Sequence, residues 1–391
     1  MKKRLLIIVN RLLQGGIDTV LIEYLKKLDR AKFTITLAIG TCMEEQEIYV
    51  HAIPSDISVH YLVKDHLLIN YRKLRSVKKI SAYQKVCDEV VLSPLRRIIQ
   101  KYNLNKLIRE NDAVIDFVST FYSFLGHCDI PKIAFFHFSF RQYHNGNERK
   151  LKRLGRKMET YDKVVTICEE MQEEGMEMYP DLKDKFLTIY NAFDLDSIRR
   201  KAEEPIDKAL AMGPYILAVQ RLEESQKDLT TLLKAYKLLV TNYNLPEKLY
   251  VIGEGRSRND LLKLCRNLKL ENRVLFLGKK INPYPWMKQC KVFVLSSKFE
   301  GCPVVLIEAM ALGKPIVSTS CPTGPSDMLD YGKAGALVAQ GDEEEMATSI
   351  LRMLKDTEYK SQILRNMKEQ IKKFDINTTV QKIEELVLSL L

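Results

Sequence analysis

Long apolar runs and closely paired cysteines are both scarce in this chain. The longest aliphatic run near the N-terminus, Leu5–Val9, is far shorter than the roughly 18 apolar residues that suggest a membrane-spanning helix. It is also too short for the apolar core of a signal peptide. The eight cysteines include no C-x-x-C pair, so we expect reduced, packed thiols and neither a disulfide framework nor a zinc site. Together these absences predict a cytoplasmic protein.

Positive charge is abundant but confined to two stretches. Residues 64–110 hold twelve Lys or Arg against four Asp or Glu, a net +8, and residues 141–163 hold eight against three, a net +5. Because the whole chain carries +11, the remainder carries −2. The pI of about 9.0 admits a nucleic-acid-binding protein as one hypothesis. Neither basic stretch contains a recognised nucleic-acid-binding module, which argues against it.

Strand-like and helix-like segments alternate along the chain, a pattern typical of parallel α/β sheets. In the first half we predict strands at residues 4–10, 33–40, 59–63, 113–118, 133–136, 163–167 and 186–189. In the second half we predict strands at residues 215–219, 249–252, 274–277, 292–295, 315–318 and 336–338. At 391 residues the chain is long for one core, and residues 191–212 carry charge and helix breakers. The pattern predicts an N-terminal domain over 1–195, a C-terminal domain over 196–375 and a final helix over 376–391.

The most informative segment follows the predicted strand at 292–295. A loop containing Glu300 leads into a short helix, with Pro303 suited to its first turn and Gly313 to its C′ position. Glu308 falls inside this helix, so the two carboxylates should lie roughly 8–12 Å apart with the helix N-terminus between them. That end favours an anion. Two acceptors beside an anion site suit a sugar–diphosphate–ribose ligand, although an isolated E-x7-E is more often a pair of solvated glutamates.

The surroundings of these glutamates resemble the retaining glycosyltransferases of family GT4. The donor-site block of that family is similar to FEGCPVVLIEAMALGKPIVSTSCPTGPSDML, residues 299–329. Further similar elements are LAVQRLEESQKDL (217–229), VIGEG (251–255), VLFLG (274–278), TIYNAFD (188–194) and VNRLLQGGIDTVLIEYLKKL (9–28). The resemblance is strong over 188–338 and weaker over 41–130. It implies the GT-B fold, in which two doubly wound, Rossmann-like domains face a cleft and the C-terminal helix packs back on the N-terminal domain.

The resemblance also assigns roles to residues. It implies that Glu308 binds the ribose hydroxyls and that Glu300 lies beside the transferred sugar. Arg221 and Lys227 would offset the charge of the departing diphosphate, as fixed cations can. The implied donor-binding set is Gly15, Gly16, Arg221, Lys227, Gly253, Glu300, Gly301, Cys302, Val304 and Glu308, with the amides of Gly301, Cys302 and Val304 serving the sugar and the β-phosphate.

The chain differs from the pattern of the family at two places near the implied site, and one histidine is added to that site. The family usually has Gly where Gln220 stands, so we expect a narrower phosphate site. Asp18-Thr19 replaces the acidic residue and Arg that often follow the Gly-Gly pair. His137 follows an apolar strand at a place where the family often has a His near the donor sugar. The implied catalytic set is therefore Glu300, His137, Arg221 and Lys227, although a lone histidine is more often structural.

The sequence gives no sign of a metal site. All six histidines lie in the N-terminal half, and none has a partner at metal-ligand spacing. Asp194 and Asp196 form a D-x-D, the metal signature of the other major glycosyltransferase fold. Here the D-x-D follows no strand end, and we interpret it as a helix cap or linker feature. We expect a metal-independent enzyme with no cofactor, whose nucleotide sugar is a substrate.

The resemblance implies a retaining glycosyltransferase that moves a hexose or N-acetylhexosamine from a UDP-sugar to a hydroxyl of a glycan acceptor. That acceptor would be linked to a polyprenyl diphosphate lipid, in the synthesis of cell-surface polysaccharide. The enzymatic alternative is a nucleotide-sugar 2-epimerase of the same fold. Apolar and aromatic residues interleave with cations around residues 67–75. This pattern predicts peripheral docking on an anionic membrane surface at the cytoplasmic face, with a solvated basic face as the alternative.

Overall fold

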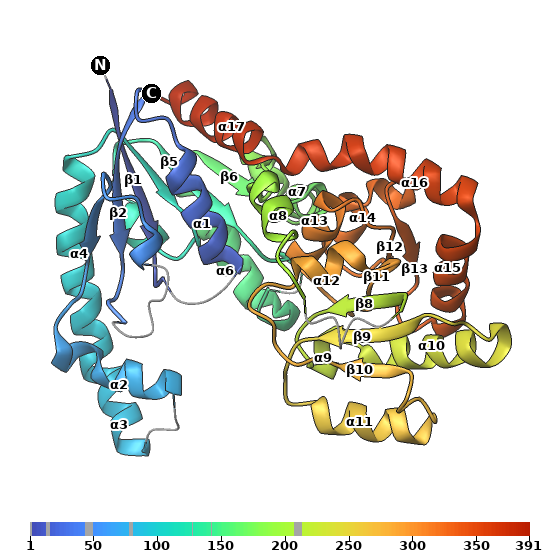
Figure 1. Ribbon diagram of the computed structural model, residues 1–391. Coiled ribbons are helices and arrows are strands. Elements are labelled where there is room, and N and C mark those ends of the chain that lie inside the picture. The colour runs from blue at the N-terminus through green and yellow to red at the C-terminus, as the bar shows by residue number, and fades with distance from the viewer. Residues whose placement is uncertain are drawn as a thin grey trace. The chain divides into compact units, whose positions relative to one another are not determined.

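The computed structural model describes residues 2–12, 16–43, 50–77, 81–126, 128–141, 143–206 and 213–391 (Figure 1). The chain forms two compact units, each with its own parallel sheet. Unit 1 contains Met1–Ile167, Gln172–Asn191 and Ile376–Leu391, and unit 2 contains Cys168–Met171 and Ala192–Asp375.

Unit 1 is built on a seven-stranded parallel sheet with the order β3-β2-β1-β4-β5-β6-β7. Its strands are β1 (Lys3–Val9), β2 (Phe33–Ile39), β3 (Ser58–Tyr61), β4 (Ala113–Asp116), β5 (Lys132–Phe136), β6 (Lys163–Thr166) and β7 (Phe186–Thr188). Residues 5–9 of β1 and all of β4 are buried, as near-continuous apolar strands are when helices cover both faces of a sheet. The strand order reverses between β1 and β4. The carboxyl ends of these two strands therefore flank a switch point where ligands commonly bind.

The α-helices of unit 1 surround this sheet. They are α1 (Gly16–Lys27), α2 (His66–Val77), α3 (Ala82–Cys87), α4 (Ser93–Arg109), α5 (Tyr122–Leu125), α6 (Glu148–Met158), most of α7 (Glu169–Met178) and α17 (Ile376–Ser389). A π-helical segment, η3 (Asp88–Leu92), joins α3 to α4. Shorter 3-10 helices are η2 (Val50–Ala52), η4 (Tyr143–Gly146) and η5 (Pro180–Lys185).

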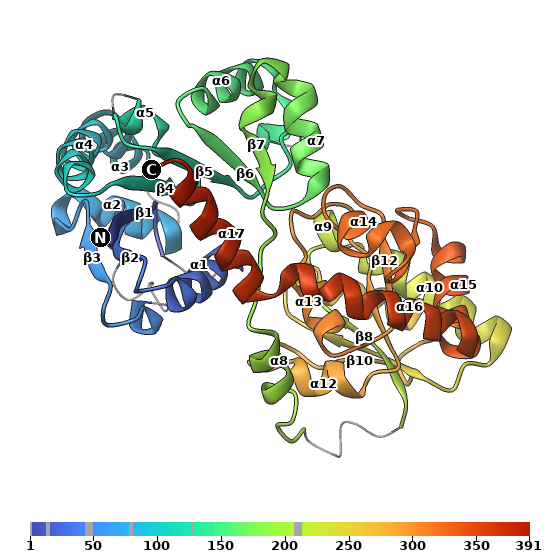
Figure 2. The same cartoon turned by 90° about the horizontal axis from the view of Figure 1, so that it is seen from above.

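The final helix, α17, packs beside α1 in unit 1 (Figure 2). It buries Val380, Ile383 and Val387, which recur at helical spacing on one side of the helix. Glu384 of α17 is only 3% exposed, accepts a hydrogen bond from the Asp29 amide at 2.7 Å and pairs with the Lys32 ammonium at 2.6 Å. This packing confirms the return of the C-terminal helix to the N-terminal domain.

Unit 2 is built on a six-stranded parallel sheet with the order β10-β9-β8-β11-β12-β13. Its strands are β8 (Tyr215–Val219), β9 (Lys248–Ile252), β10 (Val274–Phe276), β11 (Val292–Leu295), β12 (Ile316–Thr319) and β13 (Ala336–Val338). The strand order reverses between β8 and β11, which pair directly. The loops that leave these two strands therefore meet at the switch point of this sheet. The two sheets confirm the predicted α/β class with two doubly wound units.

The α-helices of unit 2 are α8 (Leu195–Lys201), α9 (Glu224–Lys227), α10 (Leu229–Tyr243), α11 (Arg258–Asn267), α12 (Tyr284–Gln289), α13 (Val304–Ala311), α14 (Pro325–Met328), α15 (Glu343–Lys355) and α16 (Thr357–Gln370). The 3-10 helices η6 (Asp330–Gly332) and η7 (Ile371–Phe374) complete the unit. Asp194 accepts a hydrogen bond from the Ser197 amide at 2.8 Å and so caps α8. This contact confirms that the first aspartate of the D-x-D is a helix cap.

The described part of the chain also shows the state of the cysteines and whether membrane-spanning helices or metal-binding clusters occur in it. All eight cysteines are free thiols. Across the described ranges, no helix has the length and apolarity needed to cross a membrane. Within the same ranges, no three or more His, Cys, Asp or Glu side chains gather in a way that could hold a metal ion.

Candidate active site in the C-terminal unit

Two loops at the switch point of unit 2 carry the predicted cations and one of the predicted glutamates. The first follows β8 and includes Arg221 and Lys227, and the second follows β11 and includes Glu300. The Lys298 amide donates to the Gln226 carbonyl at 2.7 Å, and the Gln226 side-chain amide donates to the Phe299 carbonyl at 3.2 Å. These bonds hold the two loops together although they are about 70 residues apart in sequence.

Lys227 and Glu300 form an ion pair at the centre of this site. Their side chains are 11% and 7% exposed, and the Lys227 ammonium contacts Glu300 Oε1. The Ser297 hydroxyl donates to the same carboxylate oxygen at 2.5 Å. The sequence predicted both charged residues but neither their contact with each other nor the part of Ser297. The result is a carboxylate held in a fixed orientation by two donors from two loops.

Gln220 occupies the place where the resembled family usually has glycine. Its side chain is largely buried and its Nε2 donates weakly, at 3.4 Å, to the Lys227 carbonyl and to Ser296 Oγ. Ser296 Oγ itself donates to the Lys227 carbonyl at 2.9 Å. Gln220 Oε1 is buried without a partner among the described residues. The side chain therefore lies between the two loops, where it contacts the backbone of Lys227.

Arg221 and Gly253 are the next two predicted residues near Gln220. Arg221 is exposed and donates from Nη2 to Gln226 Oε1 at 2.7 Å, so its guanidinium is anchored to the same loop as Lys227. Gly253 follows β9 with a φ of +143°, and a Cβ there would lie 1.9 Å from the Gln220 carbonyl oxygen. Only glycine allows this approach. Gly253 thus permits the loop of Arg221 to sit against β9.

Helix α13 begins directly after the Glu300 loop. Pro303 is its N-cap residue, one position before the first turn in which we expected it, and Gly313 has the positive φ of +62° that suits the predicted C′ position. The amide of Val304 lies in the first turn, where a helix provides no acceptor for its own N–H groups. Gly301 and Cys302 are partly exposed between Glu300 and this turn. Amides and a positive helix end therefore follow Glu300 immediately, as an anion site requires.

The Glu300 loop is also tied to the loop after β12, which lies within the donor-site block at 299–329. The Glu300 amide donates to the Pro322 carbonyl at 2.9 Å, and the Thr323 amide donates to the Glu300 carbonyl at 3.1 Å. Glu170 accepts a hydrogen bond from the Gly324 amide at 3.0 Å, and burial raises the pKa of its carboxyl. Glu170 lies far from this segment in sequence, so no local pattern signals its role in holding the loop.

Glu308 lies inside α13 and has a different environment from Glu300. The Tyr284 hydroxyl of α12 donates to Glu308 Oε1 at 3.0 Å. Burial raises the pKa of Glu308 to about 7, and the hydrogen bond from Tyr284 offsets only part of that rise. Tyr284 was not predicted, because nothing in the sequence shows that α12 lies against α13.

The raised pKa of Glu308 predicts a pH-dependent stability. A carboxyl whose folded-state pKa is raised holds its proton more tightly in the folded state, so its contribution favours folding at low pH and is lost as pH rises from about 4.3 through about 7. We expect Glu308→Gln to be more stable than wild type above about pH 7, on the order of 2–4 kcal/mol, and equal to it near about pH 4. Denaturant unfolding at several pH values measures this. A difference that does not change with pH would contradict the assignment.

The remaining predicted residues belong to unit 1. Gly15 lies outside the described residues, and Gly16 is the exposed first residue of α1. His137 is 4% exposed and directs Nε2 to the Phe117 carbonyl at 2.7 Å. Burial lowers the pKa of His137 to about 4, so its ring is neutral near pH 7. Nδ1 is buried without a partner within the described ranges, and it is the only ring nitrogen left for another contact.

Comparison with known proteins supports these observations. Residues 213–356 match the family described as "Glycosyl transferases group 1". The chain is 35% identical over 187 residues to the N-acetylgalactosamine-N,N'-diacetylbacillosaminyl-diphospho-undecaprenol 4-alpha-N-acetylgalactosaminyltransferase of Campylobacter jejuni. That match covers 48% of this chain and 49% of the relative, so the chain spans about half the length of this curated relative.

Two solved structures share the fold over the full length of both chains. They are lipopolysaccharide outer core galactosyltransferase WaaB, with a TM-score of 0.74, and Anabaena Alr3699/HepE in complex with UDP, with a TM-score of 0.75. Each is 19% identical to this chain and is covered over 100% of both chains. These likenesses confirm the GT-B fold, and the family match confirms the glycosyltransferase resemblance over residues 213–356.

Proposed function

We propose that this chain, whose residues 213–356 carry the group 1 glycosyltransferase pattern, is a retaining glycosyltransferase. It moves a hexose or N-acetylhexosamine from a UDP-sugar to a hydroxyl of a lipid-linked glycan, in the synthesis of cell-surface polysaccharide. The observation that carries the proposal is the buried pair of Lys227 and Glu300 directly before α13. This switch point combines a fixed cation, a fixed carboxylate and a helix N-terminus. The cation and the helix end suit a diphosphate, and the carboxylate suits the hydroxyls of the attached sugar.

The geometry suggests a separate task for each side chain. Glu308, deeper in α13, binds the ribose hydroxyls, and Glu300 orients the hydroxyls of the transferred sugar. Lys227 and Arg221 stabilise the departing diphosphate. The anomeric carbon–oxygen bond breaks, the acceptor oxygen bonds to the same face of the sugar, and the phosphate oxygen takes the proton of the acceptor. His137, through Nδ1, and the amides of Gly16, Gly301, Cys302 and Val304 complete the proposed contacts.

Transfer is favoured over 2-epimerisation by the names of the relatives. The Campylobacter relative is a transferase with a diphospho-undecaprenol substrate, and Alr3699/HepE was solved with UDP. A panel of nucleotide sugars tests the proposal, first by thermal shift and then by hydrolysis. At least one UDP-sugar should stabilise the protein and be hydrolysed slowly to UDP and free sugar. Rapid conversion of the donor into its 2-epimer without acceptor would establish the epimerase instead.

The proposed reaction needs no metal ion, because Lys227 and Arg221 supply the positive charge. We therefore expect full activity in excess EDTA, measured as release of UDP from the donor. Wild-type protein treated with EDTA and then given Mg²⁺ or Mn²⁺ is the control. Loss of activity on chelation, with recovery on adding either ion, would show that the cations of the protein do not suffice.

The proposed acceptor places the enzyme at a membrane surface, and unit 1 has a surface that suits this. Seven apolar side chains along α3, η3 and α4 are 43–78% exposed, and we call them the outer ridge: Tyr83, Val86, Val90, Val91, Leu95, Ile98 and Tyr102. Two exposed cations, Lys85 and Lys101, lie on the same elements. Exposed apolar residues beside cations favour insertion at an anionic lipid interface. Peripheral docking on the cytoplasmic face is accordingly part of the proposal.

Liposome sedimentation tests this docking. Wild type should sediment with vesicles of phosphatidylglycerol and phosphatidylcholine at low salt, and a variant with Val86, Val90, Ile98 and Tyr102 changed to Ser should not. The matched control changes Tyr243 and Ile281 of unit 2, which are also exposed apolar residues, to Ser. Equal sedimentation of the two variants would show that the outer ridge does not dock on the membrane. Self-association of wild type without lipid would show that the ridge contacts another protein chain instead.

A further inference from the structure

Helix α4 presents opposite faces to the protein and to solvent. At 3.6 residues per turn, Ser93, Arg96, Arg97 and Gln100 share one side, while Leu95, Ile98 and Tyr102 of the outer ridge share the other. In this first half Arg96 and Gln100 are buried and the apolar residues are exposed. In the second half the usual arrangement returns, since Leu104, Leu107 and Ile108 are buried on the inward side. Part of this polarity serves the fold, because Gln100 Nε2 donates to the Gly40 carbonyl at 2.8 Å. Arg97, on the same side, is exposed and serves no such contact within the described residues.

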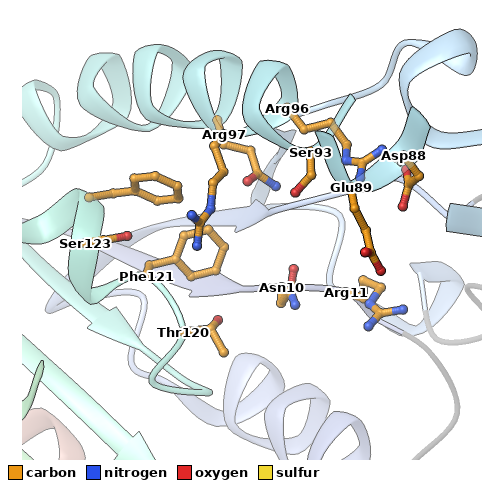
Figure 3. A pocket seen from close by; sticks show the side chains of 12 residues that line it. Asn10, Arg11, Asp88, Glu89, Ser93, Arg96, Arg97, Thr120, Phe121 and Ser123 are labelled. Atoms are coloured by element: carbon orange, nitrogen blue, oxygen red, sulfur yellow. Dashed lines mark hydrogen bonds and ion pairs between the residues drawn. The ribbon is translucent and has the colours of Figure 1, made fainter. Parts of the chain in front are cut away.

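That inward face lines a cavity of about 530 Å³ (Figure 3). Asn10 and Arg11 reach it from the loop after β1, and Thr120 and Ser123 reach it from the segment after β4. These two strands flank the switch point of the unit 1 sheet, so the cavity lies where ligands of doubly wound sheets bind. Its volume is within the range of roughly 300–1,000 Å³ found for ligand pockets.

The lining holds three guanidinium groups and three hydroxyls, together with the carboxylates of Asp88 and Glu89. Arg96 is 4% exposed, and its Nη1 is held by the Asp88 carboxylate at 2.7 Å and by the Leu68 carbonyl at 2.6 Å. Arg96 is thereby fixed at the wall of the cavity. Arg97 is exposed and extends toward the side where Ser123 and Phe121 lie, away from Glu89 (Figure 3). Across the described ranges no ion pair is formed by Arg97 or Arg11. Guanidinium forks beside hydroxyls match the oxygens of a phosphate.

We propose that this cavity binds the diphosphate of an amphiphilic acceptor, with Arg97 as the principal contact. The inference rests on the proposed function, because it assigns the acceptor of that reaction. The position of the outer ridge indicates that this diphosphate belongs to a membrane lipid. Amphipathic helices at a membrane bury their apolar face roughly 5–10 Å into the boundary between headgroups and acyl chains. With the ridge buried to that depth, the polar face of α4, about one helix diameter (roughly 10 Å) away, lies at the level of the headgroups, where the diphosphate of a membrane lipid lies.

The first test is calorimetric titration of inorganic pyrophosphate into the full chain with its donor site filled by saturating UDP. Arg97→Gln should weaken pyrophosphate binding about tenfold or more, since one charge-assisted contact is lost. Lys106→Gln, which removes the same charge from an exposed position of the same helix, should leave binding unchanged. Glu89→Gln should leave binding unchanged or tighten it, because a carboxylate is removed from the lining. No binding by wild type, or equal losses in Arg97→Gln and Lys106→Gln, would overturn the proposal.

The second test separates the lipid source from free phosphate. A polyprenyl diphosphate in anionic vesicles should bind at least about tenfold more tightly than pyrophosphate, because the ridge and the cavity then act together. Equal affinity for the two would remove the lipid from the proposal and leave a free phosphate ligand. Failure of UDP to bind would count against the proposed function only. In that case pyrophosphate would be titrated into Arg97→Gln and Lys106→Gln without UDP. A weaker affinity in Arg97→Gln alone would still show that the cavity is an anion site.

Discussion

Lys227→Ala is expected to reduce turnover by at least about 30-fold, or ~2 kcal/mol of transition-state stabilisation, by analogy with removing one donor from an oxyanion site. Lys227 is the buried cation of the site and has its ammonium on Glu300. Without it, the charge on the departing diphosphate has only the exposed Arg221 nearby in the same loop. Release of UDP at saturating donor and acceptor measures the effect.

Two controls separate catalysis from folding in this variant. Lys298→Ala removes an exposed cation from the same pair of loops and should leave turnover within about twofold. Lys227→Ala also leaves the Glu300 carboxylate buried without its cation, which can cost about 3 kcal/mol of unfolding free energy. The double variant Lys227→Met with Glu300→Gln removes both charges and should recover most of that stability without recovering turnover. Full turnover in a folded Lys227→Ala protein would exclude a role for this lysine in the reaction.

Glu308→Ala and Glu300→Ala are expected to act on different steps. Glu308 is the proposed ribose ligand, so its loss should weaken binding of UDP by on the order of 2–3 kcal/mol, about 30- to 150-fold. Glu300 is proposed to contact the sugar, so its loss should lower turnover and spare the affinity for UDP. Calorimetric titration with UDP, which lacks the sugar, distinguishes the two variants.

Tyr284→Phe is the matched control for this pair. It removes the hydrogen bond to Glu308 but keeps the carboxylate and the ring, so UDP binding should change less than in Glu308→Ala. Equal losses of UDP affinity in the Glu308 and Glu300 variants would contradict the assignment of ribose to one carboxylate and sugar to the other.

The sequence allowed accurate prediction where the signal is local. Strands of parallel sheets are buried on both faces and appear as apolar runs, which is why β1 and β11 could be placed from residues alone. The strand, loop and helix around Glu300 and Glu308 form one continuous segment, so its order was also predictable. Pro303 was misplaced by one position, because proline favours the first helical position whereas α13 begins one residue after it.

Contacts that depend on tertiary structure could not be predicted. Lys227 and Glu300 are 73 residues apart, and their pairing depends on β8 lying next to β11. Gln220 illustrates the same limit: the identity of the residue suggested an obstruction in the phosphate site, whereas neighbouring loops bury its side chain. The outer ridge escaped notice for another reason. The apolar face of α4 changes sides between its two halves, so the periodicity cancels when it is summed over the helix.

Retaining sugar transfer is tested most directly by nuclear magnetic resonance of the product made from a UDP-α-sugar and a polyprenyl-diphosphate-linked glycan. We expect UDP release and an α-linked product, formed by wild type and lost or strongly reduced in Lys227→Ala. A β-linked product would contradict retention. Complete conversion of the donor to another sugar nucleotide, with the acceptor unchanged, would contradict transfer itself.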